Sequence, residues 1–260
     1  GGGQGGGDPR TFFGKIHGQE KNLTTAAIAR MNLVLHGVED FSIVRGDTLE
    51  RPAFTERDRL RTFDVVLANP PYSIKQWNRD AFAADPYGRN RYGVPPQGRA
   101  DYAFFQHILA SLDPQTGRCA ILFPHGVLFR QEEAAMRRAL VEADRVECVL
   151  GLGPNLFYNS PMEACVLICR TSKPAERRGQ ILFINALSDV AREKAQSFLK
   201  PEHQARILEA YRGFADQPGF TYVATTEEVL NRDGDLSIPK YVEKVAPDRV
   251  GEGSPDLPAA

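Results

Sequence analysis

The chain has 260 residues, of which 42% are hydrophobic, and its formal net charge is −1. Such a length and composition suit one sizeable α/β domain with an appendage. The near-neutral charge argues against a protein that holds DNA unaided through a large basic surface. No apolar run approaches the roughly 20 residues of a membrane span, and no signal peptide opens the chain, so we expect a cytoplasmic protein.

The chain is expected to begin with a flexible glycine-rich segment over residues 1–12. Its first seven residues, GGGQGGG, include no initiating Met, so we interpret the sequence as starting inside a larger protein. From 13 to 186, short β-branched runs alternate with helical patterns, which is typical of βα units on a largely parallel sheet. The expected strands are 15–19, 41–44, 63–68, 118–123, 146–150, 164–169 and 181–185. The expected helices are 23–35, 101–112 and 131–143.

The strands expected at 146–150 and 164–169 are joined by only about a dozen residues without a helical pattern. Because a parallel crossover needs more chain, we expect an antiparallel pair at the end of an otherwise parallel sheet. Residues 187–245 are expected to form a helical extension, with helical segments at 190–196 and 201–214. Residues 246–260, rich in Pro and without apolar periodicity, predict a disordered tail.

A long stretch from 73 to 99, rich in Pro, Gly, Arg and aromatic residues, follows the strand expected at 63–68. Loops of this length in compact domains are usually functional or disordered, and the position after a strand favours function. Its arginines Arg89, Arg91 and Arg99 are candidates for phosphate contacts, although solvated arginines are the alternative. The four cysteines lie in apolar runs without a Cys-x-x-Cys pair, which indicates reduced core thiols.

The tetrapeptide Asn69-Pro70-Pro71-Tyr72 directly follows that apolar strand. Open α/β sheets bind ligands at the carboxyl ends of their strands. The exocyclic amine of a base is a poor nucleophile, and two acceptors, the Asn69 side-chain oxygen and the Pro70 carbonyl, would draw its nitrogen toward tetrahedral geometry. The prolines fix the backbone, and Tyr72 offers a face on which a flipped base can stack. The alternative is a plain turn after a strand.

With its flanks, the tetrapeptide resembles motif IV of N6-adenine DNA methyltransferases, and the surrounding sequence resembles the modification subunit of type I restriction-modification systems. The resemblance runs from about residue 13 to residue 242. Besides the tetrapeptide, its marks in chain order are His17-Gly18-Gln19-Glu20-Lys21-Asn22, Ala29-Arg30-Met31-Asn32-Leu33, Gly46-Asp47-Thr48-Leu49, Asp101-Tyr102-Ala103-Phe104, Asn155-Leu156-Phe157-Tyr158 and Ile238-Pro239-Lys240-Tyr241.

The resemblance implies a Rossmann-like fold that uses S-adenosylmethionine as its cofactor. The implied reaction is methyl transfer to the N6 amino group of adenine in DNA by direct in-line attack, without a covalent enzyme intermediate and without a metal. The implied partners are double-stranded DNA with a flipped adenine, a specificity subunit that reads the target sequence, a restriction subunit and a second modification subunit.

Three residues are expected to hold the cofactor. Glu20, at the end of a strand, would accept hydrogen bonds from the ribose hydroxyls; the alternative is a solvated charge beside Lys21. Asp47, in a Gly-Asp turn after the next strand, would accept a hydrogen bond from the adenine amino group of the cofactor; an Asx turn is the alternative. Asn69 would border the cofactor as well as the target amine.

Two further motifs are assigned by the resemblance. Asp101, together with Phe104, matches the family's motif at the start of a helix, although Asp there is equally a helix cap. Phe157, rather than Tyr158, is expected to pack against the flipped base beside Tyr72. The alternative for Phe157 is an aromatic side chain that closes a hairpin.

The sequence departs from the family pattern at its start. The family's methyltransferase domain opens with a strand and a glycine loop of the form Asp-Pro-x-Cys-Gly-Ser-Gly-Gly, preceded by a helical region, and neither is found here. We therefore expect an N-terminally truncated fold and a chain that is inactive by itself. Two alternatives stay open: a catalytically silent fragment that keeps DNA-binding or assembly surfaces, and a protein-glutamine N5 methyltransferase, in which the same tetrapeptide occurs.

Overall fold

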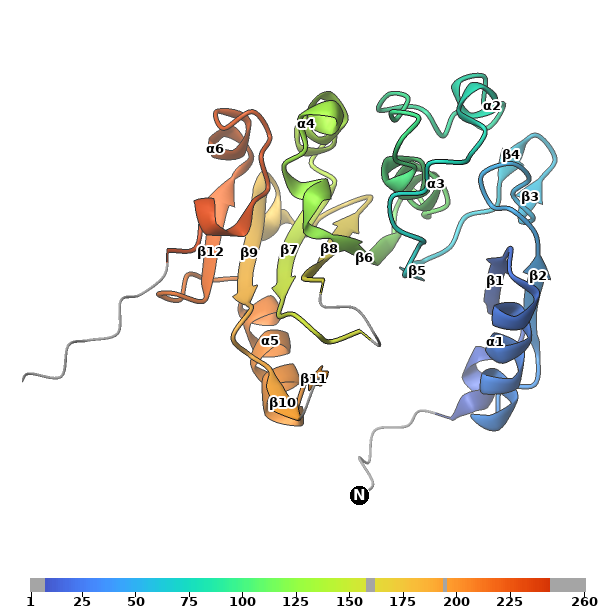
Figure 1. Ribbon diagram of the computed structural model, residues 1–260, viewed down its shortest axis with the longest axis horizontal. Helices are drawn as coiled ribbons and strands as arrows, with labels where there is room; N and C mark the ends of the chain where they lie inside the picture. The colour runs from blue at the N-terminus through green and yellow to red at the C-terminus, as the bar shows by residue number, and fades with distance from the viewer. Residues whose placement is uncertain (1–7, 158–161, 194–195, 244–260) are drawn as a thin grey trace, which may run out of the picture.

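A computed structural model describes residues 8–157, 162–193 and 196–243 (Figure 1). Within them the chain forms an α/β structure with a six-stranded sheet and a separate two-stranded parallel unit. The α/β prediction is therefore confirmed. The glycine-rich residues 1–7 and the predicted disordered tail lie outside the described residues.

The N-terminal unit consists of β1 (Ile16–Glu20), α1 (Leu23–Leu35) and β2 (Phe41–Arg45). The side chain of Asn22 accepts a hydrogen bond from a backbone N–H of the first turn, so α1 begins where the sequence predicts. β1 and β2 pair in parallel. Only Ala26 of α1 is buried, so most of this helix contributes little to a core.

The main sheet has the order β12-β9-β7-β8-β6-β5. β5, β6, β7 and β9 run in one direction, while β8 is antiparallel to β6 and β7, and β12 is antiparallel to β9. The predicted antiparallel pair, β7 with β8, is thus confirmed, but it lies inside the sheet. Its strands are β5 (Val65–Ala68), β6 (Arg118–Pro124), β7 (Val146–Leu152), β8 (Ala164–Arg170), β9 (Gln180–Ala186) and β12 (Thr221–Thr225).

The other described elements are helices and short strands outside the main sheet. Two predictions for the segment after β9 need correction. The helix predicted at 190–196 is wrong, because residues 191–193 and residue 196 lie in the antiparallel strands β10 and β11. The Ser197 N–H of β11 donates to the Asn155 carbonyl, and this tertiary contact outweighs helix propensity. The extension is also not purely helical, since β12 joins the main sheet. The division of the chain into domains stays a prediction.

The helices and short strands outside the main sheet and the N-terminal unit are β3 (Thr55–Glu56), β4 (Arg59–Leu60), α2 (Arg79–Ala83), α3 (Asp101–Ala110), α4 (Ala134–Glu142), β10 (Ala191–Glu193), β11 (Gln196–Phe198), α5 (Pro201–Gly213) and α6 (Thr226–Leu230).

Two apolar clusters pack against the main sheet. The larger one joins α3 and α4 to the sheet and to the motif at 238–241. In that motif the Tyr241 ring stacks on Phe183 of β9 with centroids 3.9 Å apart. The smaller one includes residues of α5. All four cysteines are buried and free, as predicted, and burial raises the pKa of Cys148 and Cys165. None of the described helices is long and apolar enough to cross a membrane.

One cavity is lined by residues of the N-terminal unit and of the main sheet, whose ribbons lie apart in Figure 1. β1 pairs only with β2, and β5 pairs only with β6, so each has one edge without a partner strand among the described residues. Residues of both strands line the cavity. The side chains of Val65 and Leu67 on β5 are 47% and 78% exposed. Two unsatisfied strand edges thus border one cavity.

Candidate functional site

The cavity has a volume of about 1170 Å³ and brings together the residues predicted to bind the cofactor. Glu20 ends β1, Asp47 lies in the turn after β2, and Asn69 lies in the turn after β5. All three line the cavity, and so do Pro70 and Pro71. Glu20 and Asn69, 49 positions apart in the sequence, therefore share one cavity, as expected for residues at the carboxyl ends of strands in an α/β fold.

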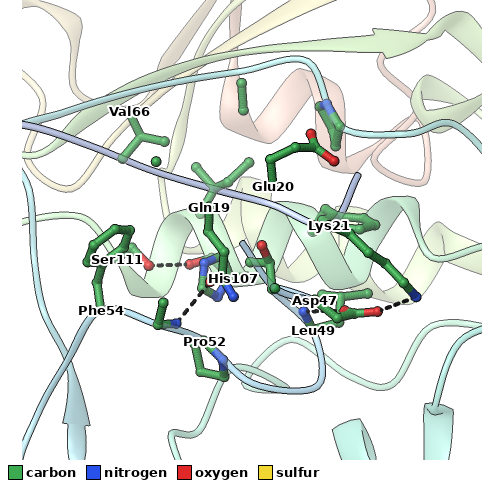
Figure 2. A pocket seen from close by; sticks show the side chains of 18 of the residues that line it. Gln19, Glu20, Lys21, Asp47, Leu49, Pro52, Phe54, Val66, His107 and Ser111 are labelled. Atoms are coloured by element: carbon green, nitrogen blue, oxygen red, sulfur yellow. Dashed lines mark hydrogen bonds and ion pairs between the residues drawn. The ribbon is translucent and has the colours of Figure 1, made fainter. Parts of the chain in front are cut away.

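The half-buried Glu20 keeps one carboxylate oxygen for a ligand. Its Oε1 accepts a hydrogen bond from the Asn22 N–H at 2.7 Å, which ties the side chain to the start of α1. Among the described residues no protein group bonds Oε2. Figure 2 shows this carboxylate on the strand that crosses the pocket.

Asp47 is held more tightly than the sequence indicates. Its Oδ1 accepts the N–H groups of Leu49 and Glu50 at 3.0 and 3.3 Å, so the Asx turn is present. Its Oδ2 lies 2.8 Å from Nζ of the exposed Lys21, and a dashed line marks this contact in Figure 2. Burial opposes ionisation, but the Lys21 ammonium and the backbone N–H groups outweigh it and lower the pKa of Asp47. Oδ2 carries a second lone pair, so it can accept a hydrogen bond from a ligand beside the one from Lys21.

The tetrapeptide forms an internal hydrogen bond. Tyr72 is half-buried, and its hydroxyl donates to Oδ1 of the exposed Asn69 at 2.8 Å. Burial raises the pKa of Tyr72 to about 12, so this hydroxyl remains a donor at neutral pH. The Asn69 oxygen has a second lone pair, so a target amine can donate to it alongside the Tyr72 hydroxyl. Neither Tyr72 nor Phe157, both of them described, lines the cavity; Phe157 is half-buried in the β7–β8 connection, and Tyr158 lies outside the described residues.

Asp101 begins α3 but does not cap it. The N-cap residue of α3 is Ala100, and no side chain caps the helix. Instead, the buried Asp101 carboxylate accepts the N–H of Ser73, the residue after the tetrapeptide, at 2.8 Å. Phe104 lines the cavity. The sequence singled out this motif but not the residue that it contacts.

Arg89 is not free to contact a phosphate. This corrects the prediction that it is a phosphate-binding residue of the long loop at 73–99. Its side chain is 3% exposed and forms an ion pair with Asp85 at 2.6 Å. It also donates to the carbonyls of Thr48 and Leu49, next to Asp47, at 2.9 and 2.8 Å. The guanidinium therefore fastens the long loop to the turn after β2. Contacts of Arg91 and Arg99 with phosphates stay predictions.

Removing the Arg89 side chain, with its ion pair to Asp85 and its bonds to the turn after β2, should destabilise the protein. Because Arg89→Ala leaves a buried carboxylate on Asp85 without its partner, we expect the free energy of unfolding to fall by roughly 3 to 5 kcal/mol. Arg138→Ala is the matched control, since the pair of Arg138 with Glu142 is exposed and should be worth at most about 1 kcal/mol. Urea denaturation followed by circular dichroism measures the free energy of unfolding of both variants. Equal decreases would contradict a stabilising role for the buried Arg89 contacts.

His17 and Gln19 belong to the motif at 17–22, but the sequence assigned neither of them a role. His17 of β1 packs against Phe54 and Phe63 with ring centroids 5.2 and 5.3 Å apart, which joins the N-terminal unit to the main sheet. The Gln19 amide spans two backbone groups, donating to the Arg51 carbonyl and accepting from the Ala53 N–H. These contacts link positions more than 30 residues apart. Among the described residues no cluster of His, Cys, Asp and Glu could hold a metal ion.

Comparison with known proteins yields consistent matches. The N-6 DNA methylase family matches residues 9–249. The methylase subunits of the type I restriction enzymes MjaVII of Methanocaldococcus jannaschii and HindI of Haemophilus influenzae are each 34% identical over 87% of this chain. The type I restriction-modification methyltransferase subunit of Streptococcus thermophilus superposes with a TM-score of 0.80 at 35% identity, over 87% of this chain and 48% of that one. The chain spans 40% and 52% of the two curated relatives, about half their length.

Proposed function

This chain belongs to the N-6 DNA methylase family, and we propose that it provides the catalytic motif of an enzyme that methylates the N6 amino group of adenine in DNA. The observation that carries the proposal is the position of Asn69 and Pro70 on the cavity that Glu20 and Asp47 also line. In such an arrangement the target amine and the methyl donor meet at one strand end.

The residues of the cavity fit S-adenosylmethionine. A volume of about 1170 Å³ accommodates a ligand of this size. We propose that Glu20 binds the ribose through its carboxylate, that Asp47 accepts from the adenine amino group, and that Asn69 borders the methyl group. The bound cofactor supplies an electrophilic methyl group. The lowered pKa of Asp47 supports this role, because an ionised carboxylate is a strong acceptor at neutral pH.

The chemistry required of the protein is modest. The Asn69 oxygen and the Pro70 carbonyl accept hydrogen bonds from the target amine, which localises its lone pair and stabilises the positive charge that develops on nitrogen. Pro70 is buried, and proline fixes φ, so its carbonyl needs little reorganisation during the reaction. With the cofactor bound, the amine nitrogen would attack the methyl group directly and in line, the sulfur would leave as a neutral thioether, and the methylated nitrogen would lose one proton to solvent.

Tyr72 is proposed to stack on the flipped adenine, with Phe157 as a second aromatic surface. Tyr72→Ala should weaken capture of the base by roughly 1 to 3 kcal/mol, the range for aromatic stacking on unpaired bases. Tyr72→Phe keeps the ring and loses only the hydrogen bond to Asn69, so it should be tolerated. With 2-aminopurine at the target position, only the Ala variant should lose the enzyme-induced fluorescence change. Equal behaviour of the two variants would contradict stacking.

We propose that DNA binding and target recognition depend on partners. A net charge of −1 gives the chain little general attraction for phosphates. The relatives are named as methylase subunits of type I restriction enzymes, so we propose a specificity subunit, a restriction subunit and a second copy of the methylase subunit as partners. Because the substrate is DNA, the proposed location is the cytoplasm.

Methyl transfer to DNA tests the function directly. The complete gene product, with its partner subunits, is incubated with methyl-labelled S-adenosylmethionine and genomic DNA, and the digested DNA is searched for labelled N6-methyladenine by mass spectrometry. The same reaction is offered denatured cellular protein. Label in glutamine rather than adenine would favour the protein methyltransferase, and label in neither would favour the silent fragment.

A further inference from the structure

Ser73 connects the tetrapeptide to the long loop with an unusual backbone conformation. Its φ is 50°, in the left-handed region that non-glycine residues rarely adopt. The Ser73 N–H donates to Oδ1 of Asp101 at 2.8 Å, and its hydroxyl lies 3.3 Å from Oδ2. Such a conformation persists only where surrounding groups hold it. In this structure the holding group is the Asp101 carboxylate, 28 residues further along the chain.

The Asp101 carboxylate is itself held by a buried ionic network with Arg130 and Glu133. Nη2 of Arg130 lies 2.6 Å from Asp101 Oδ2, and Nε of the same guanidinium lies 2.7 Å from Glu133 Oε2. Both carboxylates are fully buried. Burial would lower the pKa of Arg130, but its bonds to Glu133 and Asp101 outweigh this and raise it. The guanidinium therefore stays charged, and the three groups carry one excess negative charge when both acids are ionised.

Arg130 is held in the segment between β6 and α4. Its N–H donates to the Gly126 carbonyl, just beyond β6, at 3.0 Å. Its carbonyl accepts from Nη1 of the buried Arg137, a residue of α4, at 3.0 Å. Since β6 is the strand next to β5, the ion pair of Arg130 with Asp101 links the segment after β6 to the residue that holds the turn after β5.

We propose that Asp101, fixed by Arg130 and Glu133, is a positioning residue for the tetrapeptide turn. It holds the backbone at Ser73 so that the Asn69 oxygen and the Pro70 carbonyl point at the same target amine. The inference rests on the proposed function. It also accounts for the Asp101 motif, since this side chain serves the turn and not the helix.

Two substitutions separate the parts of this role. Asp101→Asn keeps an oxygen that can accept the Ser73 N–H but removes the charge that binds Arg130, whereas Asp101→Ala removes both. In the complete, assembled gene product we expect kcat for DNA methylation to fall about tenfold in the Asn variant and about a hundredfold in the Ala variant, because a displacement of about 1 Å at the reacting groups has this effect. The dissociation constant for S-adenosylmethionine should stay within about threefold, since neither Glu20 nor Asp47 is touched.

Glu147→Gln is the matched control. Glu147 is a fully buried carboxylate paired with Arg170 at 2.8 Å, but it lies at the amino end of β7, the opposite end from the turn. The Glu147→Gln substitution should lower the free energy of unfolding and leave kcat of the folded protein unchanged. A wild-type kcat in folded Asp101→Ala would overturn the inference, and so would an equal loss of kcat in Glu147→Gln or a loss of cofactor affinity as large as the loss of kcat.

Hydrogen exchange gives a readout that does not depend on activity. The Ser73 amide, which donates to Asp101, should exchange faster in Asp101→Ala than in the wild type and should be unchanged in Glu147→Gln. Unchanged exchange in Asp101→Ala overturns the positioning role, whether or not the wild type methylates DNA. A wild type that does not methylate DNA overturns the proposed function instead, and the exchange result still decides whether Asp101 holds the turn.

Discussion

Asn69→Ala is expected to lower the rate of adenine methylation by on the order of a hundredfold, the usual cost of losing one such hydrogen-bonding group in a transition state. The lost acceptor acts mainly on the positive charge that develops during transfer, so binding of S-adenosylmethionine and DNA should change only a few-fold. The substitution also removes the partner of the Tyr72 hydroxyl, but the aromatic ring stays in place for stacking.

Single-turnover methylation by the complete, assembled gene product measures this effect, and filter binding and calorimetry follow DNA and cofactor. Asn78→Ala is the matched control, because Asn78 lines the same cavity while its side chain caps α2. This variant should keep its rate of methylation. If Asn69→Ala retains more than about a tenth of the wild-type rate, its oxygen is not the acceptor for the target amine.

Residues 1–260 expressed on their own are expected to be inactive and to bind S-adenosylmethionine poorly. Glu20 and Asp47 are present, but the described residues contain no glycine loop that lets the methionine part of the cofactor approach the backbone closely. The unpaired edges of β1 and β5 border the same cavity. With Val65 and Leu67 exposed on β5, such edges favour aggregation or pairing with another chain in water.

Titration calorimetry with light scattering tests this expectation on residues 1–260, with the complete gene product titrated in parallel. We expect weak or undetectable heat of cofactor binding and particles larger than a monomer. A soluble monomer that binds the cofactor with low-micromolar affinity would show that the glycine loop is not needed for binding.

Local signals predicted most of the secondary structure. The helix at 23–35 was predicted at its observed bounds because its apolar spacing and the glycine at 37 act within a few residues. Strands such as β2 and β6 agree within about one residue, because an apolar β-branched run is itself a local property. The family resemblance, together with the rule that ligands bind at strand ends, selected Glu20, Asp47 and Asn69, and the structure places all three on one cavity.

The tertiary structure decided which side chains contact one another. A phosphate contact for Arg89 and a helix cap for Asp101 were both consistent with the sequence, but their real partners are the backbone of the 48–49 turn and Ser73, far away along the chain. The insertion of β8 between β6 and β7 was not predicted for the same reason. Residue type and spacing determine local conformation and the end of the sheet that binds ligands, whereas burial and hydrogen-bond partners depend on the path of the whole chain.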